Sequence, residues 1–486
     1  MQLSVDRLYL DTLLNLSATA MARLIRERQV SSFELVTAHL EHIRKINPAL
    51  NAVVDLLADS ALRDAQRADS QLVKKKSALD EPCGPLHGVP ISVKDSIDVQ
   101  GAKCTAGTLG RKNAAPAQRD ATLVHRLRAA GAIPIAKTNL PDLLFAFESD
   151  NLIYGRTNNP YDLTRTSGGS SGGESALIAA CGSPLGLGSD AAGSVRLPAA
   201  FCGIAGIKPT SGRLPRTGHV PPAGGWIEAL WQIGPMARHT EDLILALHLL
   251  GAEDGQDFTS PPVPLLPSPA PSALRIAFFT HNGFAPCTPA IRNAVARCAD
   301  FLARTGMRVE ECRPPSIHEA FDLELGLLGA DGVDGIDAYL RDAGSTQLHP
   351  LLTAWLDRMR PLRATASELA SRWMQWDHYR AEMAAFFNQY DAILCPVYTH
   401  PALKHGESVK PGNFEGFSYT MAWNIAGAPA ATVRCSETDG LPINVQVVAK
   451  PWRDLTALAL CQIIETEFGG WREPPPVTST CKPQLI

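Results

Sequence analysis

The sequence predicts an α/β protein in which helices are layered on a β-sheet. Three observations support this fold class: strand-like runs alternate with capped helices from about residue 84 onward, no internal repeat is present, and the composition is that of an ordinary globular chain. Hydrophobic residues make up 45% and charged residues 19% of the 486 residues. A chain of this length can bury a large core, and a single large unit is common among α/β proteins.

The first elements are two amphipathic helices over residues 17–45. Ser31 precedes the second helix, and Glu34 follows it at the spacing of a capping box. His39 and His42 lie three residues apart within this helix. Because no third ligand is evident nearby, we interpret these two histidines as part of a surface face and not as a metal site.

A strand and a helix follow. Apolar and other side chains alternate over residues 89–94, which predicts a half-buried strand with Lys94 at its end. Asp120 is placed to cap a helix that stops at Gly131, and residues 132–136 indicate a buried strand.

Two further helices carry recognisable start and stop signals. Thr240 is predicted to cap a helix that ends at Gly251, and Thr288 to cap another that ends at Gly306. Strand-like runs flank the second of these helices, at residues 274–279 and 307–311.

We interpret residues 1–486 as one domain with four parts. These are N-terminal helices over 1–75, a catalytic core over 76–255, a proline-rich linker over 256–273, and a C-terminal part with a helical insertion over 314–390.

Composition excludes several classes of protein. The net charge of −4 gives no basic excess for nucleic-acid binding. None of the eleven cysteines forms a C-x-x-C pair, which favours free thiols in a reducing compartment. Asp6 and Asp11 interrupt the apolar start, so we expect no signal peptide, and no apolar run reaches the length of a membrane span. We therefore expect a cytoplasmic protein.

The segment 167–212 is crowded with glycine and serine and allows three interpretations. In the first, residues 169–173 form a G-x-S-x-G nucleophile elbow of an α/β-hydrolase-type esterase, with Ser171 as nucleophile. This interpretation needs an acid and a histidine downstream, for which the candidates are Asp391 with His400 or His405.

The second interpretation is a dinucleotide loop formed by Gly186, Gly188 and Ala191. No acidic residue lies between Asp190 and Glu228 to hold a ribose, which argues against it.

The third interpretation is a pair of serines served by a lysine. Ser170 and Ser194 each lie beside glycine, and Lys94 ends a strand far upstream. Serine and lysine can replace serine and histidine as nucleophile and base.

Several motifs resemble the amidase signature family along nearly the whole chain. They are GGSSGG at 168–173, GSDAAGSVRLPAAFCGIAGIKPT at 188–210, GPLHGVPISVKD at 84–95, YGRTNNP at 154–160, NIAGAPA at 424–430 and GLPINVQVVA at 440–449. Within the family, GGESALIAACGSPLGLGSD at 172–190 is most similar to fatty-acid amide hydrolases and related bacterial amidases.

The resemblance implies a fold and a set of roles. The fold is a single large α/β domain with a central mixed, twisted sheet covered by helices on both faces. Lys94 matches the family's base, Ser170 the serine that follows a cis peptide bond, and Ser194 the nucleophile. An oxyanion hole is implied at the backbone N–H groups of Ala191, Ala192 and Gly193, followed by that of Ser194 itself.

The implied reaction is hydrolysis of amide C–N bonds through an acyl-enzyme, without a metal or another cofactor. Aryl and acyl amides are the expected substrates, with carbamates, urethanes and esters as further candidates. A tRNA-dependent amidotransferase subunit is the alternative within the family, and a homo-oligomer is left open. We expect no nucleic-acid partner and no membrane span.

Two features bear on the substrate. The family usually has glycine where this chain has Ala192, and the added Cβ excludes a positive φ and narrows the space beside the acyl group. Trp226 and Trp231, together with the leucine-rich insertion, predict a pocket for an apolar acyl or aryl group.

Overall fold

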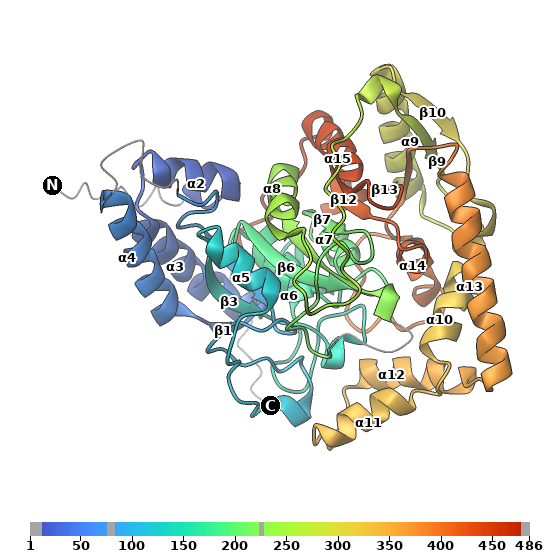
Figure 1. The fold of residues 1–486 in the computed structure, drawn as a ribbon, viewed down its shortest axis with the longest axis horizontal. Coiled ribbons are helices and arrows are strands. Elements are labelled where there is room, and N and C mark those ends of the chain that lie inside the picture. The colour runs from blue at the N-terminus through green and yellow to red at the C-terminus, as the bar shows by residue number, and fades with distance from the viewer. Residues whose placement is uncertain (1–11, 75–82, 223–227, 478–486) are drawn as a thin grey trace.

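A mixed eleven-stranded sheet runs through the protein (Figure 1). The structure, a computed structural model, describes residues 12–74, 83–222 and 228–477. The strand order is β1-β3-β2-β6-β8-β7-β12-β13-β11-β9-β10. The strands are β1 (Val53–Leu56), β2 (Pro90–Lys94), β3 (Ile133–Thr138), β6 (Leu185–Asp190), β7 (Ala205–Lys208), β8 (Gln232–Ala237), β9 (Arg275–Phe278), β10 (Arg308–Glu311), β11 (Ala392–Pro396), β12 (Ala430–Thr438) and β13 (Leu441–Ala449), and β4 (Asn158–Asn159) pairs separately with β5 (Asp162–Thr166).

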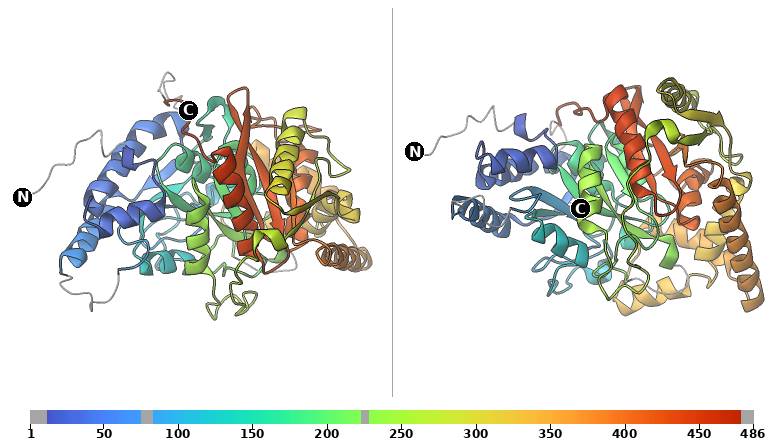
Figure 2. Two further views of the ribbon diagram at one scale, coloured as in Figure 1. Left: turned by 90° about the horizontal axis from the view of Figure 1, so that it is seen from above. Right: turned by 45° about the horizontal axis from the view of Figure 1, so that its top comes forward.

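Helices cover both faces of this sheet (Figure 2), as the resemblance implies. Side chains of α5, α8, α9 and α15 share one apolar core with the strands, and those of α4, α6 and α7 belong to a second. The helices are α2 (Ala18–Arg26), α3 (Ser32–Leu50), α4 (Ala58–Lys74), α5 (Thr122–Ala129), α6 (Gly172–Ala179), α7 (Arg196–Phe201), α8 (Thr240–Leu250), α9 (Pro289–Arg304), α10 (Ala320–Leu328), α11 (Asp334–Asp342), α12 (Pro350–Met359), α13 (Ala366–Phe386), α14 (Ser418–Ile425) and α15 (Asp454–Phe468).

Of three predicted helix caps, one forms as expected, one lacks its hydrogen bond, and one is wrong. Ser31 and Glu34 form a complete capping box at the start of α3. Thr288 is the N-cap residue of α9, although its hydroxyl makes no capping hydrogen bond. The helix predicted to be capped by Thr240 begins at that residue, and His239 is its N-cap.

Three further local predictions are wrong. All five residues of β2 are buried, because this strand lies between β3 and β6 in a sheet with helices on both faces. Asp120 does not cap α5, since its carboxylate accepts a hydrogen bond from the backbone N–H of Gln100 at 2.8 Å. His39 is buried and His42 half-buried, and both rings contact carbonyl oxygens just after α6, at 3.1 and 2.7 Å.

The chain between β10 and β11 is helical and gathers at one side of the molecule (Figure 1). It contains α10, α11, α12 and α13, and α10 packs against α14 and α13. Within the described ranges, every helix is too short or too polar to cross a lipid bilayer.

Candidate active site

The candidate site lies where the parallel strands β2 and β6 end. Val93 of β2 pairs with Leu187 of β6, so Lys94 and Asp190, the last residues of these strands, come to the same edge of the sheet. This edge is the usual place for a ligand in an open α/β sheet. Helix α6 packs so closely on β6 that a Cβ on Gly186 would lie only 1.7 Å from Glu174 Oε1 of that helix.

Lys94 is fully buried and surrounded by hydroxyl groups. Its Nζ lies 2.7 Å from Ser170 Oγ, 3.0 Å from Ser171 Oγ and 3.1 Å from Ser189 Oγ. The backbone oxygen of Ser189 lies 3.4 Å away. Among the described residues, no carboxylate forms an ion pair with this lysine.

Burial lowers the pKa of Lys94 from its ordinary value of 10.5 to about 7. Water no longer solvates the ammonium group, so the protonation equilibrium shifts toward the neutral amine. The negative charges of Asp190 and Glu174 oppose the shift but do not cancel it. A considerable fraction of Lys94 is therefore neutral near pH 7, and a neutral amine can accept a proton.

Ser170 and Ser171 lie in the loop that leads into α6. The Gly169–Ser170 peptide bond is cis, and Ser170 lines a pocket. The backbone N–H of Ser171 donates to the carbonyl oxygen of Ser194 at 3.1 Å. This hydrogen bond joins the two glycine- and serine-rich segments that the sequence singles out.

Ser194 lies in the turn between β6 and α7. Gly193, just before it, has a φ of +126°, and a Cβ there would lie 2.3 Å from Thr420 Oγ1. Only glycine fits that position. Ala192 is not among the positive-φ residues, so its Cβ causes no backbone strain, and its methyl group lines the pocket.

Asp190 holds this turn in place. Its carboxylate accepts the backbone N–H of Gly193 at 2.8 Å and that of Val195 at 3.1 Å, and it pairs with the buried Arg196 at 2.8 Å. Burial alone would raise the pKa of Asp190, but the charge and hydrogen bonds of Arg196 outweigh it and hold the pKa below its usual range. Asp190 and Arg196 thus form a buried ion pair that fixes this loop.

Removing one partner of this pair is expected to destabilise the fold strongly. Asp190→Ala leaves Arg196 as a buried charge without its carboxylate and should lower the free energy of unfolding by about 3 to 5 kcal/mol. Urea unfolding measures the loss. Asp334→Ala, which removes the partner of Arg363 in an exposed pair, is the matched control and should change stability far less. Equal losses in the two variants would contradict this structural role.

Three backbone N–H groups of the turn are free to bind an anion. The amides of Ala191, Ala192 and Ser194 make no hydrogen bond to any described residue, whereas that of Gly193 already donates to Asp190. Free amides held on a rigid turn can stabilise negative charge that develops on an oxygen.

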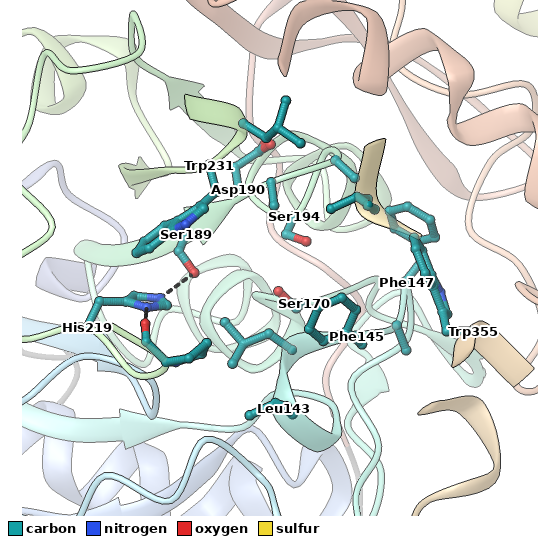
Figure 3. Close-up of a pocket in the computed structure, with 17 residues that line it drawn as sticks. Leu143, Phe145, Phe147, Ser170, Ser189, Asp190, Ser194, His219, Trp231 and Trp355 are labelled. Atoms are coloured by element: carbon teal, nitrogen blue, oxygen red, sulfur yellow. Dashed lines mark hydrogen bonds between the residues drawn. The ribbon is translucent and has the colours of Figure 1, made fainter. Parts of the chain in front are cut away.

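A pocket opens over these groups (Figure 3) and holds about 770 Å³ of space, including its mouth. Ser170 and Ser194 both line it. Their hydroxyl groups face the same space, yet no hydrogen bond joins them. Lys94 is not part of the lining and contacts Ser170 at 2.7 Å. The remaining wall is largely apolar and includes Leu143, Leu144, Phe145, Ala146, Phe147, Ala192, Pro221, Leu230, Trp231, Leu328 and Trp355.

The structure adds two residues that sequence reasoning missed. Ser189 contacts Lys94, and His219 contacts Ser189 and lines the pocket. Ser189 lies in the serine-rich segment, whereas nothing in the sequence links His219 to it. Ser171, a nucleophile candidate from the sequence, contacts Lys94. Of the two predicted pocket tryptophans, Trp231 lines the pocket, and Trp226 lies outside the described residues.

Ser171 lacks the partners of a nucleophile elbow. Its hydroxyl donates to the carbonyl oxygen of Ser189 at 3.2 Å, and its side chain is fully buried. His400 and His405 bind Thr399 and the carbonyl oxygen of Leu163 instead, so among the described residues no histidine contacts Ser171. The esterase interpretation therefore has no geometric support.

Comparison with known proteins agrees with this arrangement. The Amidase family matches residues 34–458. Fatty-acid amide hydrolase 2-A of Danio rerio is 34% identical and aligns with 96% of this chain and 91% of its own length. A glutamyl-tRNA(Gln) amidotransferase subunit of Symbiobacterium thermophilum is 31% identical, with 92% of this chain and 95% of its own covered. A solved structure of fatty acid amide hydrolase superposes with a TM-score of 0.84 at 26% identity, covering 96% of this chain and 87% of that one.

These matches span almost the whole chain, and they include both the fold and the serine-rich segment. The family and the fold class expected from the sequence motifs are thus confirmed. The chain belongs to the amidase family and is a serine hydrolase that cleaves amide bonds.

Proposed function

We propose that Ser194, Ser170 and Lys94 carry out this hydrolysis on small amides with an apolar acyl or aryl group. The observation that carries the proposal is the 2.7 Å contact between a buried, partly neutral Lys94 and Ser170 at the floor of the pocket that Ser194 lines.

The first step is the activation of Ser194. A serine hydroxyl is a weak nucleophile and needs a base. Neutral Lys94 takes the proton of Ser170, and Ser170 takes the proton of Ser194 as the latter attacks the substrate carbonyl. The missing hydrogen bond between the two serines forms when the bound substrate and its oxyanion position Ser194, as catalytic hydrogen bonds often tighten only in the complex.

The oxyanion then lies against the free amides of Ala191, Ala192 and Ser194. Loss of one such donor typically costs about 10²- to 10³-fold in rate. The proton held by Lys94 returns through Ser170 to the leaving nitrogen, which departs as an amine. Water hydrolyses the acyl-enzyme by the same route, so the reaction needs only these residues and water.

The pocket wall favours an apolar substrate. Among the described lining residues, Asp190 is the one charged side chain, and Arg196 neutralises it. An aryl or alkyl group can pack against Phe147 and Trp355, whose ring centroids lie 5.3 Å apart. Anilides, aryl carbamates and urethanes present the same carbonyl beside an apolar group and are included in the proposal.

The absence of free charges in the described wall argues against the amidotransferase alternative. Such a subunit takes ammonia from a donor like glutamine, whose ammonium and carboxylate groups need oppositely charged partners. The one charged side chain in the described wall, that of Asp190, is already paired with Arg196.

A substrate panel distinguishes the proposed amide hydrolase from an amidotransferase subunit. The purified chain alone is given 4-nitroanilides of increasing acyl length, phenylacetamide, an N-aryl carbamate, a phenyl ester and glutamine. We expect anilides to be cleaved, with kcat/KM rising with acyl length, and glutamine to be left intact. Glutaminase activity without anilide hydrolysis would overturn the proposal.

The proposed base also fixes the pH dependence. The active form contains neutral Lys94, and burial lowers the pKa of that group to about 7. The kcat/KM for an anilide should therefore rise with pH through a midpoint near 7 and reach a plateau above about pH 8. Initial rates between pH 5 and 9 measure this profile. A rate that falls over this range would exclude a deprotonated base.

We further propose a cytoplasmic location and no nucleic-acid partner. The ten cysteines in the described part of the chain are free thiols, most of them buried. Thiols of this kind fit a reducing compartment.

A further inference from the structure

His219 is connected to Lys94 through a single hydroxyl group, that of Ser189, whose contact with the histidine is drawn in Figure 3. Its Nε2 lies 3.0 Å from Ser189 Oγ, and Ser189 Oγ lies 3.1 Å from Lys94 Nζ. On the other side of the ring, Nδ1 lies 3.0 Å from the carbonyl oxygen of Pro221. A carbonyl oxygen only accepts, so Nδ1 carries the hydrogen of this ring.

The tautomer of His219 follows from these contacts. Burial lowers the pKa of His219 to about 3, so the ring is neutral at ordinary pH. In a neutral imidazole with its hydrogen on Nδ1, Nε2 is an acceptor. The hydroxyls of Ser189 and Ser96 both lie within donating distance of this Nε2, at 3.0 and 3.1 Å. When the hydroxyl of Ser189 donates to His219, its lone pairs turn toward Lys94.

The same reasoning orients the second neighbour of the lysine. The hydroxyl of Ser171 donates to the carbonyl oxygen of Ser189, so it too presents a lone pair to Lys94, at 3.0 Å. A neutral amine has two hydrogens and one lone pair. Ser171 and Ser189 accept the two hydrogens, and the lone pair is left facing Ser170, 2.7 Å away.

We propose that His219 is a positioning residue which, through Ser189, directs the lone pair of Lys94 toward Ser170. The inference rests on the proposed roles of Lys94 and Ser170. Without an acceptor at Nε2, the hydroxyl of Ser189 can rotate and donate to the lone pair of Lys94, which then no longer accepts the proton of Ser170.

The fold holds His219 in this place. Its ring packs on Trp231, with 4.4 Å between ring centroids. Its backbone N–H donates to the carbonyl oxygen of Arg216 at 3.0 Å, and its backbone bridges to Ile97, three residues after Lys94. The hydroxyl of Ser96 lies 3.1 Å from the same Nε2 and is the competing donor.

Two variants of His219 test the proposal on an anilide substrate. His219→Phe keeps a ring against Trp231 but removes the acceptor, and it should lower kcat about 10- to 100-fold with KM changed less than about twofold. His219→Gln places an amide oxygen near the position of Nε2 and should recover kcat to within a few-fold of the wild type. Loss of only substrate affinity in His219→Phe would show a pocket-lining role instead.

Variants of the two serines complete the design. Ser189→Ala should lower kcat as His219→Phe does, and the double variant should be no slower than either, because both remove one connected path. Ser96→Ala removes the competing donor and should retain activity. If His219→Phe does not fold, as judged by circular dichroism, Ser189→Ala decides: wild-type kcat there overturns the proposal.

Different results would overturn the proposed function and the role of His219. The proposed function is overturned if the wild type cleaves no amide or if Ser194→Ala remains active. The present inference fails if those two tests hold while His219→Phe keeps the wild-type kcat or while His219→Gln is as slow as His219→Phe.

Discussion

Ser194→Ala should reduce anilide hydrolysis by about 10⁴-fold or more, to a rate near background. The variant loses the only atom that the proposed mechanism bonds to the acyl group, while the free amides of the turn and the pocket remain. Steady-state rates measure the loss. Mass spectrometry after rapid acid quench should find the acyl group on the peptide that contains Ser194 in the wild type and on none in the variant.

A buried serine away from the pocket provides the control. Ser183 donates to the carbonyl oxygen of Leu185 at 2.8 Å, at the start of β6, and Ser183→Ala should keep the wild-type kcat. The adduct also separates the two nucleophile candidates. An acyl group on Ser171 would restore the nucleophile elbow, which the hydrogen bonds of that serine do not support.

The sequence was most informative where local geometry restricts the choice of residue. Gly193 must be glycine because its φ is positive and Thr420 fills the space of a Cβ. The alternation over residues 89–94 correctly indicated a strand that ends at Lys94. Ser31 and Glu34 form the predicted capping box because that motif involves residues only three apart.

The exposure of strand β2 could not be predicted in the same way. Its non-apolar positions indicated a face in water, but that face packs under α6. Ser92 donates to Glu174 Oε1 of α6. Lys94 contacts Ser170 and Ser171, the two serines just before that helix. A polar residue satisfied by another buried polar residue has the same sequence pattern as one satisfied by water.

His219 shows the same limit at longer range. It lies 125 residues after Lys94 in the chain, within a stretch that carries no catalytic motif. Its contact with Ser189 depends on where the loop after β7 passes the end of β2. The backbone bridge between His219 and Ile97 fixes that position. Such a contact belongs to the tertiary structure and leaves no local signal.

Lys94→Met is expected to reduce amide hydrolysis by about 10³-fold or more, since it removes the base but keeps a side chain of similar length in the buried site. Any residual activity should no longer rise through a midpoint near pH 7, because the group with that pKa is gone. Rates measured from pH 5 to 9 test both points, and a variant with wild-type kcat would exclude Lys94 as the base.

The same substitution should change the pH dependence of stability. Burial lowers the pKa of Lys94 from 10.5 to about 7, so the unfolded chain binds a proton that the folded protein resists. The resulting penalty on the folded wild type begins as the pH falls below about 10.5 and is complete below about 7, where it is on the order of 5 kcal/mol. Methionine carries no such penalty.

Urea unfolding at pH 9 and pH 6 isolates this effect. The stability of Lys94→Met relative to the wild type should increase by about 2 to 3 kcal/mol as the pH falls between these values. The hydrogen bonds that the variant loses involve serines, which do not titrate here, so they affect both measurements equally. Glu174, whose pKa burial raises to about 7, titrates in both proteins, and most of its contribution disappears from the difference. A pH-independent difference would mean that the amine is charged in the folded protein, and a charged amine cannot take the proton of Ser170.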